Sequence, residues 1–435
     1  MGDLSIRRWQ FLLVTCAVLC AAGTWLYANR VLAPNILAYD IEHGLPHGNN
    51  SDLYPRWLGA RELLLHGRDP YTMEITREIQ AGMYGSPLPP DKYGQGQNYQ
   101  QGFYYPVYVA FILAPTLDLP FEKVKRGFVW VLFALTLVSI PLWLHLLHWP
   151  LPLWMQATCM IFTIGSVAIM QGLKLEQITL LVVPLIAAAM ALLAADRQVP
   201  AGILLALATI KPQFVWLSLL WLAIWTLGDW RRRYRWAASF LITMAILCAG
   251  SEYYLPHWIA RFWQAIREYN RYTGEMPVAE MMVGPLGRAI EFLAIVFMVH
   301  ACWKERRREA NSDAFAFTVS MVLAISVLVM PSYHPYNQAL LIPALLIMVK
   351  GRRMIWRRSW INRVLTVITL VFIGWPWLSA FVLASLSFVF PAEAIGKGAL
   401  MPIWTALVIP VAVSATMLVY AGQRTFAASG EAATS

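Results

Sequence analysis

Three polar side chains in this chain stand out because each interrupts or borders an apolar stretch. Asp52 comes directly before a segment of helical pattern, Lys211 lies inside an apolar window of about 30 residues, and His334 lies between two such windows. A carboxylate can act as a general base, and a lysine or histidine can bind a phosphate. These residue types at these places suggest a base and a set of phosphate ligands.

Asp52 has two compatible interpretations. Ser51 and Asp52 precede a predicted helix that has Gly67 at its expected C-terminal stop, so Asp52 is a good N-cap. The positive end of the helix dipole also favours an ionised carboxylate, which a general base requires. Asp69, which precedes a proline, is predicted to be a turn residue.

The other polar residues also leave alternatives open. A lysine near the centre of a membrane helix costs about 2.5–3.5 kcal/mol, so Lys211 must face a polar cavity or partner, or else reach an interface. Pro212 follows it, and we predict a broken or kinked helix there. His334 either binds a phosphate or sugar hydroxyl or caps a short loop. Arg56 and Arg61 either bind phosphate or lie at the membrane surface.

The composition indicates that these residues belong to a membrane protein. Of 435 residues, 59% are hydrophobic and 13% are charged, and the mean hydropathy is +0.54. Several apolar windows exceed the roughly 20 residues that cross a bilayer. We predict an all-α, polytopic transmembrane helical bundle of about 12 spans, with both termini inside.

The net charge of +10 lies in short basic runs between apolar windows, at 7–8, 123–126, 231–235, 304–308 and 350–358. Such runs are typical of cytoplasmic helix ends near anionic lipids, so membrane lipids and not nucleic acid are the expected partners. With these runs inside, two polar loops are expected outside. The first contains amphipathic interfacial helices and is expected to hold Asp52 over a cavity formed by later spans.

The predicted order has six parts: a first span with the N-terminus (1–29), an external loop with the catalytic helix (30–102), transmembrane spans beginning at 103–119 (103–250), a second external loop (251–285), C-terminal spans (286–421) and a disordered tail (422–435). The five cysteines lie in or beside apolar windows and are expected to be buried apolar residues. No metal site is predicted, since the pairs His43/His47 and His145/His148 lack acidic or cysteine partners.

The chain resembles glycosyltransferase family 87, GT-C-type membrane enzymes that include a phosphatidylinositol-mannoside mannosyltransferase. The motifs that carry the resemblance follow one another along the sequence: Asp52 and Tyr54, ARELL at 60–64, GRDPY at 67–71, Tyr105-Pro106, Glu176-Gln177, ALATIKPQ at 206–213, and His334 before Asn337 and Pro343. At two positions the chain departs from the family pattern. Val107 stands where a second proline is common, and Glu176 where a glycine is common.

The resemblance implies transfer of a hexose, with mannose as the first candidate, from a polyprenyl monophosphate donor to a lipid or glycan acceptor. It implies inversion, no cofactor and no metal, at a site that faces outward from a bacterial plasma membrane. Asp52 would be the general base, because a phosphate leaving group needs little protonation. The donor phosphate would be bound by Lys211, His334 and Arg61, and the acceptor or sugar by Arg56, Tyr54, Tyr105 and Gln177.

Two other classes remain open from the sequence. A transporter or lipid-linked glycan flippase fits the kinked helices and the intramembrane lysine, but it does not explain Asp52 directly after the first span. An O-antigen-ligase-like enzyme would use a diphosphate-linked donor and place its large loop late, whereas the larger loop here is early.

Overall fold

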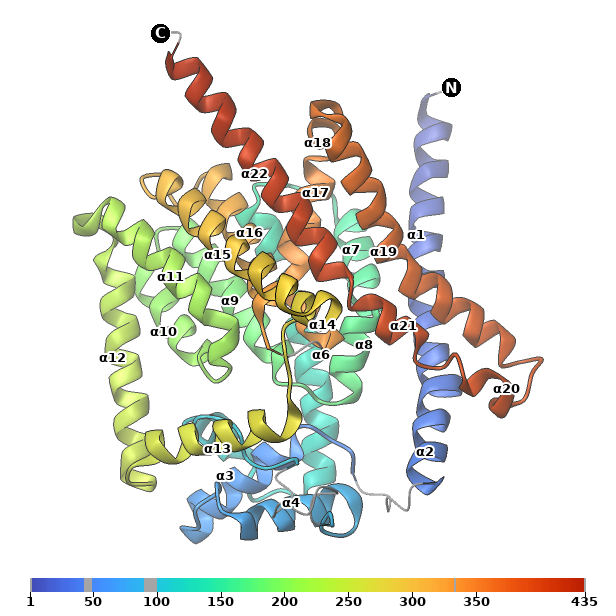
Figure 1. Ribbon diagram of the computed structural model, residues 1–435, viewed down its shortest axis with the longest axis vertical. Helices are drawn as coiled ribbons and strands as arrows, with labels where there is room; N and C mark the ends of the chain where they lie inside the picture. The colour runs from blue at the N-terminus through green and yellow to red at the C-terminus, as the bar shows by residue number, and fades with distance from the viewer. Residues whose placement is uncertain (1, 43–48, 90–99, 332–333, 434–435) are drawn as a thin grey trace.

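The fold is built from helices alone wherever the structure describes the chain. The computed structural model describes residues 2–42, 49–89, 100–331 and 334–433, and every regular element in these ranges is helical (Figure 1). This confirms the all-α prediction.

The α-helices are α1 (Gly2–Tyr27), α2 (Ala33–Glu42), α3 (Tyr54–His66), α4 (Met73–Tyr84), α5 (Val109–Leu113), α6 (Phe121–Leu146), α7 (Leu153–Ile164), α8 (Val167–Lys174), α9 (Thr179–Ala194), α10 (Gln198–Ala208), α11 (Pro212–Gly228), α12 (Trp230–Tyr254), α13 (Trp258–Thr273), α14 (Val278–Val283), α15 (Pro285–Glu305), α16 (Asp313–Val329), α17 (Ile342–Lys350), α18 (Arg352–Arg358), α19 (Trp360–Leu386), α20 (Ala392–Gly396), α21 (Met401–Ala406) and α22 (Ile409–Ala433). A π-helical segment, η1 (Ala28–Leu32), joins α1 to α2, and two 3-10 segments are η2 (Ala114–Thr116) and η3 (Pro335–Leu341).

Within the described residues, six helical segments are long and apolar enough to cross a membrane, or seven if the bent pair of α7 and α8 counts as one span. The six are Arg8–Tyr39, Phe121–Leu146, Trp230–Tyr254, Pro285–Glu305, Trp360–Leu386 and Ala394–Gln423. The predicted count of about 12 is therefore not confirmed. The apolar helices α9, α10, α11 and α16 have only 11 to 17 residues each. A 16-residue helix is about 24 Å long, which is shorter than a bilayer core of about 30 Å.

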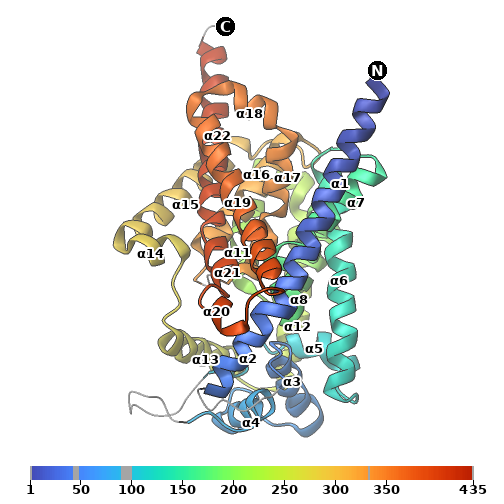
Figure 2. The ribbon, with the colours of Figure 1, turned by 90° about the vertical axis from the view of Figure 1, so that its right-hand side faces the viewer.

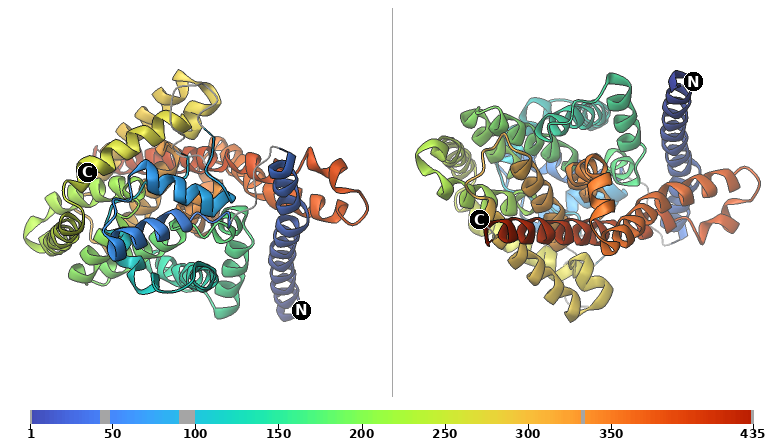
Figure 3. Two further views of the ribbon diagram at one scale, coloured as in Figure 1. Left: turned by 90° about the horizontal axis from the view of Figure 1, so that it is seen from below. Right: turned by 90° about the horizontal axis from the view of Figure 1, so that it is seen from above.

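The two ends of the bundle differ in what they carry (Figures 1 and 2). The N-terminal end of α1, the C-terminal end of α22 and the basic helix α18 lie at one end. At the opposite end α3, α4 and α13 lie across the long helices, as the view from below also shows (Figure 3). We refer to the part formed by α3, α4 and α13 as the loop end.

The stretch predicted as a second span, 103–119, does not cross the bundle. It forms the five-residue helix α5 and the turn η2, and most of its apolar side chains are buried or partly buried, with α5 against α3. Since the chain does not cross here, α6 begins at the loop end (Figure 2). The Lys125 amine there donates to the carbonyl oxygen of Asn49 at 2.7 Å. The prediction that the run 123–126 lies on the opposite side from the first polar loop is therefore wrong.

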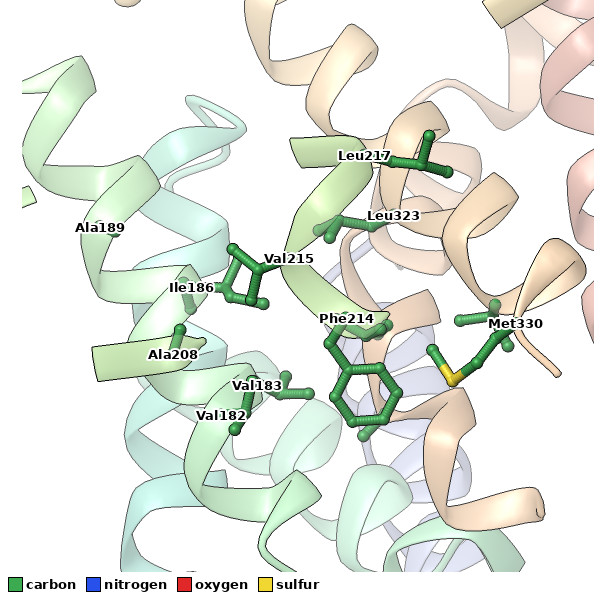
Figure 4. Packing of buried hydrophobic residues seen from close by; sticks show 14 of the residues in the cluster. Val182, Val183, Ile186, Ala189, Ala208, Phe214, Val215, Leu217, Leu323 and Met330 are labelled. Atoms are coloured by element: carbon green, nitrogen blue, oxygen red, sulfur yellow. The ribbon is translucent and has the colours of Figure 1, made fainter. Parts of the chain in front are cut away.

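The window 199–228 is broken where the sequence predicted. α10 ends at Ala208 and α11 begins at Pro212, so Lys211 lies in the break. A proline in the first helical turn loses no hydrogen bond, because that N–H has no partner within the helix. Apolar residues of α9, α10, α11 and α16 pack around the break, with Val183, Phe214 and Leu323 buried (Figure 4).

The two predicted external loops pack on each other at the loop end. α3 has Pro55 in its first turn and ends at Gly67 with φ +67°, the stop expected from the sequence. Asp69 is a turn residue, as predicted, since its carboxylate accepts a hydrogen bond from the Tyr71 N–H at 2.9 Å. Its other carboxylate oxygen pairs with Arg261 of α13. The turn after α3 therefore fixes α13 over the first loop.

Candidate functional site

Asp52 lies in the turn before α3 and is not its N-cap. The N-cap is Leu53, which makes no side-chain capping bond. The Asp52 carboxylate instead accepts a hydrogen bond from the Nε2 amide of Gln177, and the Asp52 N–H donates to the Leu175 carbonyl at 3.0 Å. The capping interpretation is therefore wrong. The contacts of Asp52 are with the segment between α8 and α9, so its carboxylate is directed into the bundle.

Lys211 is joined to Asp52 through Gln177. The Lys211 amine donates to Oε1 of Gln177 at 3.2 Å and to the hydroxyl of Thr179 at 2.7 Å. Lys211 is only 5% exposed, and Gln177 and Thr179 are also buried. Both hydrogen-bond partners are neutral, so the positive charge of Lys211 is available to an anionic ligand. The break between α10 and α11 thus presents a buried cation to the first turn of α9.

Tyr105 lies between two cations. The Arg56 guanidinium carbon is 4.4 Å from the centroid of the Tyr105 ring, and Arg56 also donates to the Asp52 carbonyl. Burial opposes ionisation of Tyr105, but the positive charges of Arg56 and Lys211 outweigh it and hold the pKa of Tyr105 below its usual range. Burial likewise opposes the charge on Arg56, yet Tyr105 and Asp52 together raise the pKa of its guanidinium. The site therefore concentrates positive charge around one phenol.

His334 reaches this group of residues through Tyr336. The two rings are stacked with centroids 5.1 Å apart, and the Lys211 amine is 5.2 Å from the centroid of the Tyr336 ring. His334 Nε2 also lies 3.3 Å from the Glu275 carboxylate, which accepts a hydrogen bond from the Tyr269 hydroxyl at 3.1 Å. The loop after α13 therefore contacts the predicted phosphate ligand. Tyr333, the first residue of this motif in the sequence, lies outside the described residues.

Two predicted site residues have other surroundings. The Tyr54 ring packs edge-on against Phe121, with centroids 4.8 Å apart. The Arg61 guanidinium carbon lies 5.4 Å from the Trp57 ring. Tyr54 therefore belongs to the packing of α3 on α6, and Arg61 contacts another side chain of α3 itself. The residues that the structure brings together in one site are Asp52, Gln177, Lys211, Arg56 and Tyr105.

Two residues of the site were missed by the sequence interpretation. Thr179, a hydroxyl in the first turn of an otherwise apolar helix, is a Lys211 partner, and that placement is a usable signal. Glu275 follows the left-handed Gly274 at the end of α13, and nothing local indicates that it meets His334. In the ranges that the structure describes, no group of three or more His, Cys, Asp or Glu side chains is arranged to hold a metal. His43 and His47 lie outside those ranges.

Comparison with known proteins identifies the family. No curated protein and no solved structure gives a match. The family model described as glycosyltransferase family 87 matches residues 103–331, a region that contains Tyr105, Gln177 and Lys211, begins after Asp52 and ends before His334. The match covers more than half of the 435 residues. Together with the apolar helices, it establishes that this integral membrane protein belongs to glycosyltransferase family 87.

Proposed function

We propose that this glycosyltransferase moves a hexose, with mannose as the first candidate, from a polyprenyl monophosphate donor to a hydroxyl of a lipid or glycan acceptor. The observation that carries the proposal is the hydrogen-bonded series from Asp52 through Gln177 to Lys211. It joins a carboxylate to a buried cation that donates to an amide oxygen and a hydroxyl, so a base and an anion ligand are held in one site.

The proposed chemistry is a single displacement with inversion. The acceptor O–H bond breaks and its proton passes to the Asp52 carboxylate. The acceptor oxygen forms a bond to the anomeric carbon from the face opposite the phosphate. The bond between the anomeric carbon and the phosphate oxygen breaks, and its electron pair leaves with the lipid phosphate. A single carboxylate suffices because a phosphate leaving group needs little protonation.

Lys211 and Arg56 are the proposed main ligands of the donor phosphate. His334 is a further proposed ligand, and it stacks on Tyr336, whose ring lies next to the Lys211 amine. The Nε of Arg56 is buried and makes no hydrogen bond within the described part of the chain. Lys211 has neutral partners, so both cations have capacity for an oxyanion. Charge-assisted hydrogen bonds from buried groups are about twice as strong as neutral ones. This assignment replaces Arg61, the arginine first expected from the sequence, with Arg56.

The proposed orientation puts the loop end outside the plasma membrane of a bacterial cell. The basic helix α18 lies at the end opposite α3, α4 and α13 (Figure 1). Basic residues at helix ends favour the cytoplasmic side, so this arrangement favours a site that faces outward. Tyr104 and Tyr269, whose rings are tilted at 43° with centroids 4.7 Å apart, join the two loops beside the site and offer aromatic faces to a sugar.

The test is sugar transfer by the purified protein in nanodiscs, using labelled polyprenyl-phosphate mannose and lipid acceptors. Asp52→Asn is expected to lower the rate by about 10³-fold, the usual contribution of a positioned general base. Asp69→Asn is the matched control, since Asp69 is also an aspartate of the first loop but serves a turn and an ion pair with Arg261. A wild-type protein without transfer from any polyprenyl-phosphate sugar would refute the donor assignment. An Asp52→Asn variant that is folded and fully active would refute Asp52 as the base.

A further inference from the structure

A second carboxyl group lies beside Asp52, and the mechanism above does not use it. Glu176 is the residue before Gln177, and its side chain is only 3% exposed. Its Oε2 is buried and has no hydrogen-bond partner in the part of the chain that the structure describes. A buried acceptor without a partner costs about 1–3 kcal/mol, and more when it is charged, so its presence calls for a reason.

The backbone at Glu176 is also unusual. Its φ of +49° is in the left-handed region, where residues other than glycine are uncommon. Such conformations cost of order 1–3 kcal/mol and cluster at functional sites. The segment 175–177 is fixed there by the bond from the Asp52 N–H to Leu175 and by the contact between Gln177 and the Asp52 carboxylate. The chain therefore holds the buried Glu176 carboxyl, on a strained backbone, in a segment that is hydrogen-bonded to the proposed base Asp52.

The surroundings of Glu176 make its charge sensitive to pH. Burial is the main cause that raises its pKa, from 4.5 to about 7. The neighbouring charges of Asp52 and Glu122 add to the rise, while a hydrogen bond from Ser51 and the Lys125 cation oppose it. Glu176 lies between α8 and α9, outside the six long apolar segments. These neighbours are the charged groups that act on it from the turn before α3 and from α6.

We propose that Glu176 is a positioning residue for the transfer reaction, and that its negative charge makes Asp52 a stronger base. The proposal rests on the proposed function, in which Asp52 takes the acceptor proton. The Asp52 charge acts on Glu176, and two neighbouring carboxylates repel, so the repulsion favours proton uptake by either one. When Glu176 carries its own proton the repulsion is absent and Asp52 accepts the acceptor proton less readily. The most active form of the site therefore has both groups ionised.

The test is the pH dependence of sugar transfer at saturating donor and acceptor. A group with a pKa of about 7 goes from about one tenth ionised at pH 6 to about nine tenths at pH 8. We expect the wild-type rate to rise over this range by up to about ninefold, the limit for a protonated form without activity. Glu176→Gln keeps the side-chain shape but has no charge, so its rate should change less than twofold over the same range and stay below the wild-type plateau.

Two further variants make the direction of the effect testable. Lys125→Gln removes a cation that favours ionised Glu176, so the rise should move to higher pH. Glu122→Gln removes a like charge, so the rise should move to lower pH. Glu176→Gly suits the left-handed backbone and provides a folded variant without the carboxyl if Glu176→Gln does not fold. An unchanged rise near pH 7 in Glu176→Gln or Glu176→Gly would overturn the proposal, as would a flat wild-type profile.

Thermal unfolding separates this proposal from the assignment of the reaction. Because the folded-state pKa of Glu176 is raised from 4.5 to about 7, the native state binds its proton more tightly than the unfolded state. Wild-type stability should therefore fall as pH rises through this interval, and Glu176→Gln should remove that fall. If stability falls with rising pH and no sugar transfer is found, the proposed reaction is wrong, while the raised pKa of the buried Glu176 is supported. If the fall is absent in the wild type, the proposal for Glu176 is wrong whatever the reaction.

Discussion

The two faces of α3 carry the same residue types in different surroundings. On one face Arg56 lies against the Tyr105 ring and donates to the Asp52 carbonyl. On the other, Arg61 lies over the Trp57 ring of its own helix. Both arginines have a buried Nε with no hydrogen-bond partner among the described residues, so burial alone does not distinguish them. What distinguishes the first face is a second cation, Lys211, that reaches the same phenol from a different part of the chain.

Tyr54, the first residue of α3, and Tyr105, which lies against Arg56, show the same contrast in their ionisation. Burial raises the pKa of Tyr54, and the nearby Glu78 carboxylate raises it further. Tyr105 is also buried, but Arg56 and Lys211 lower its pKa. A phenol with a lowered pKa reports positive potential at its oxygen, which is the environment that a phosphate requires. Arg56 and Lys211 supply this potential at Tyr105, and matched substitutions on the two faces test whether it matters.

The largest effect in this comparison is expected from the cation that α3 does not supply. Lys211→Gln keeps a polar group in the break between α10 and α11 but removes its charge. A hydrogen bond to a charged group is worth about 1.5–3 kcal/mol, so kcat/KM for the donor should fall by about 10- to 100-fold.

Lys174→Gln is the control for Lys211, because Lys174 is an exposed lysine near the same segment that bonds Asn29 at 2.6 Å. Its initial rates should stay within about threefold of wild type, as for an exposed polar contact. Equal losses in the two variants would show that general membrane electrostatics, and not a phosphate site, accounts for the effect.

Part of this site could be predicted from the sequence for clear physical reasons. A lysine followed by proline inside an apolar window has few acceptable positions, and a helix break with polar partners is one of them. The stop at Gly67 and the turn at Asp69 follow from the conformational preferences of those residues. Local chemistry decides each of these features, so no knowledge of distant contacts is needed.

Other parts depend on distant contacts. Asp52 has the sequence signature of a cap, but its carboxylate is bonded by Gln177, which is 125 positions away. The stretch 103–119 is apolar enough to suggest a span, yet it does not cross the bundle. Most of its apolar side chains are at least partly buried and α5 packs on α3, which reverses the side assigned to Lys125. Helix geometry separates Arg56 from Arg61, but which of the two faces the site depends on the distant residue Lys211. Five residues at about 100° each place the two side chains about 140° apart around the helix.

The two arginines of α3 are expected to differ in their effect on donor use. Arg56→Gln should lower kcat/KM for the donor by about 30-fold, since it removes one charged ligand of the proposed phosphate and leaves Lys211 in place. Arg61→Gln should lower it by no more than about fivefold, because a single exposed cation–π contact is worth about 0.5–1 kcal/mol. Initial rates at varied donor concentration measure both. A larger loss of kcat/KM in Arg61→Gln than in Arg56→Gln would indicate that the donor phosphate binds on the Arg61 face of α3.

The smallest expected effects come from the two phenols. Tyr105→Phe removes the hydroxyl that lies between Arg56 and Lys211 while keeping a ring for Arg56 to stack on. Without that partner the two cations repel, and the empty site loses part of its preorganisation, so kcat/KM should fall by about five- to tenfold. The donor KM should carry most of the loss, since the phosphate itself supplies the missing negative charge once it is bound.

Tyr54→Phe is the matched control, because the Tyr54 ring packs on Phe121 and its hydroxyl lies against Gly82. The charges that act on this hydroxyl are those of Glu78, Arg61 and Glu62, and they include two carboxylates. The kcat/KM of Tyr54→Phe should stay within about twofold of wild type, because the Tyr54 ring belongs to the packing on Phe121 and not to the proposed phosphate site. Added phosphate sharpens the contrast. Phosphate that binds between Arg56 and Lys211 should inhibit Tyr105→Phe more strongly than it inhibits the wild type. Tyr54→Phe should be inhibited to the same extent as the wild type. Equal inhibition of all three proteins would mean that the positive potential at Tyr105 is not where the donor phosphate binds.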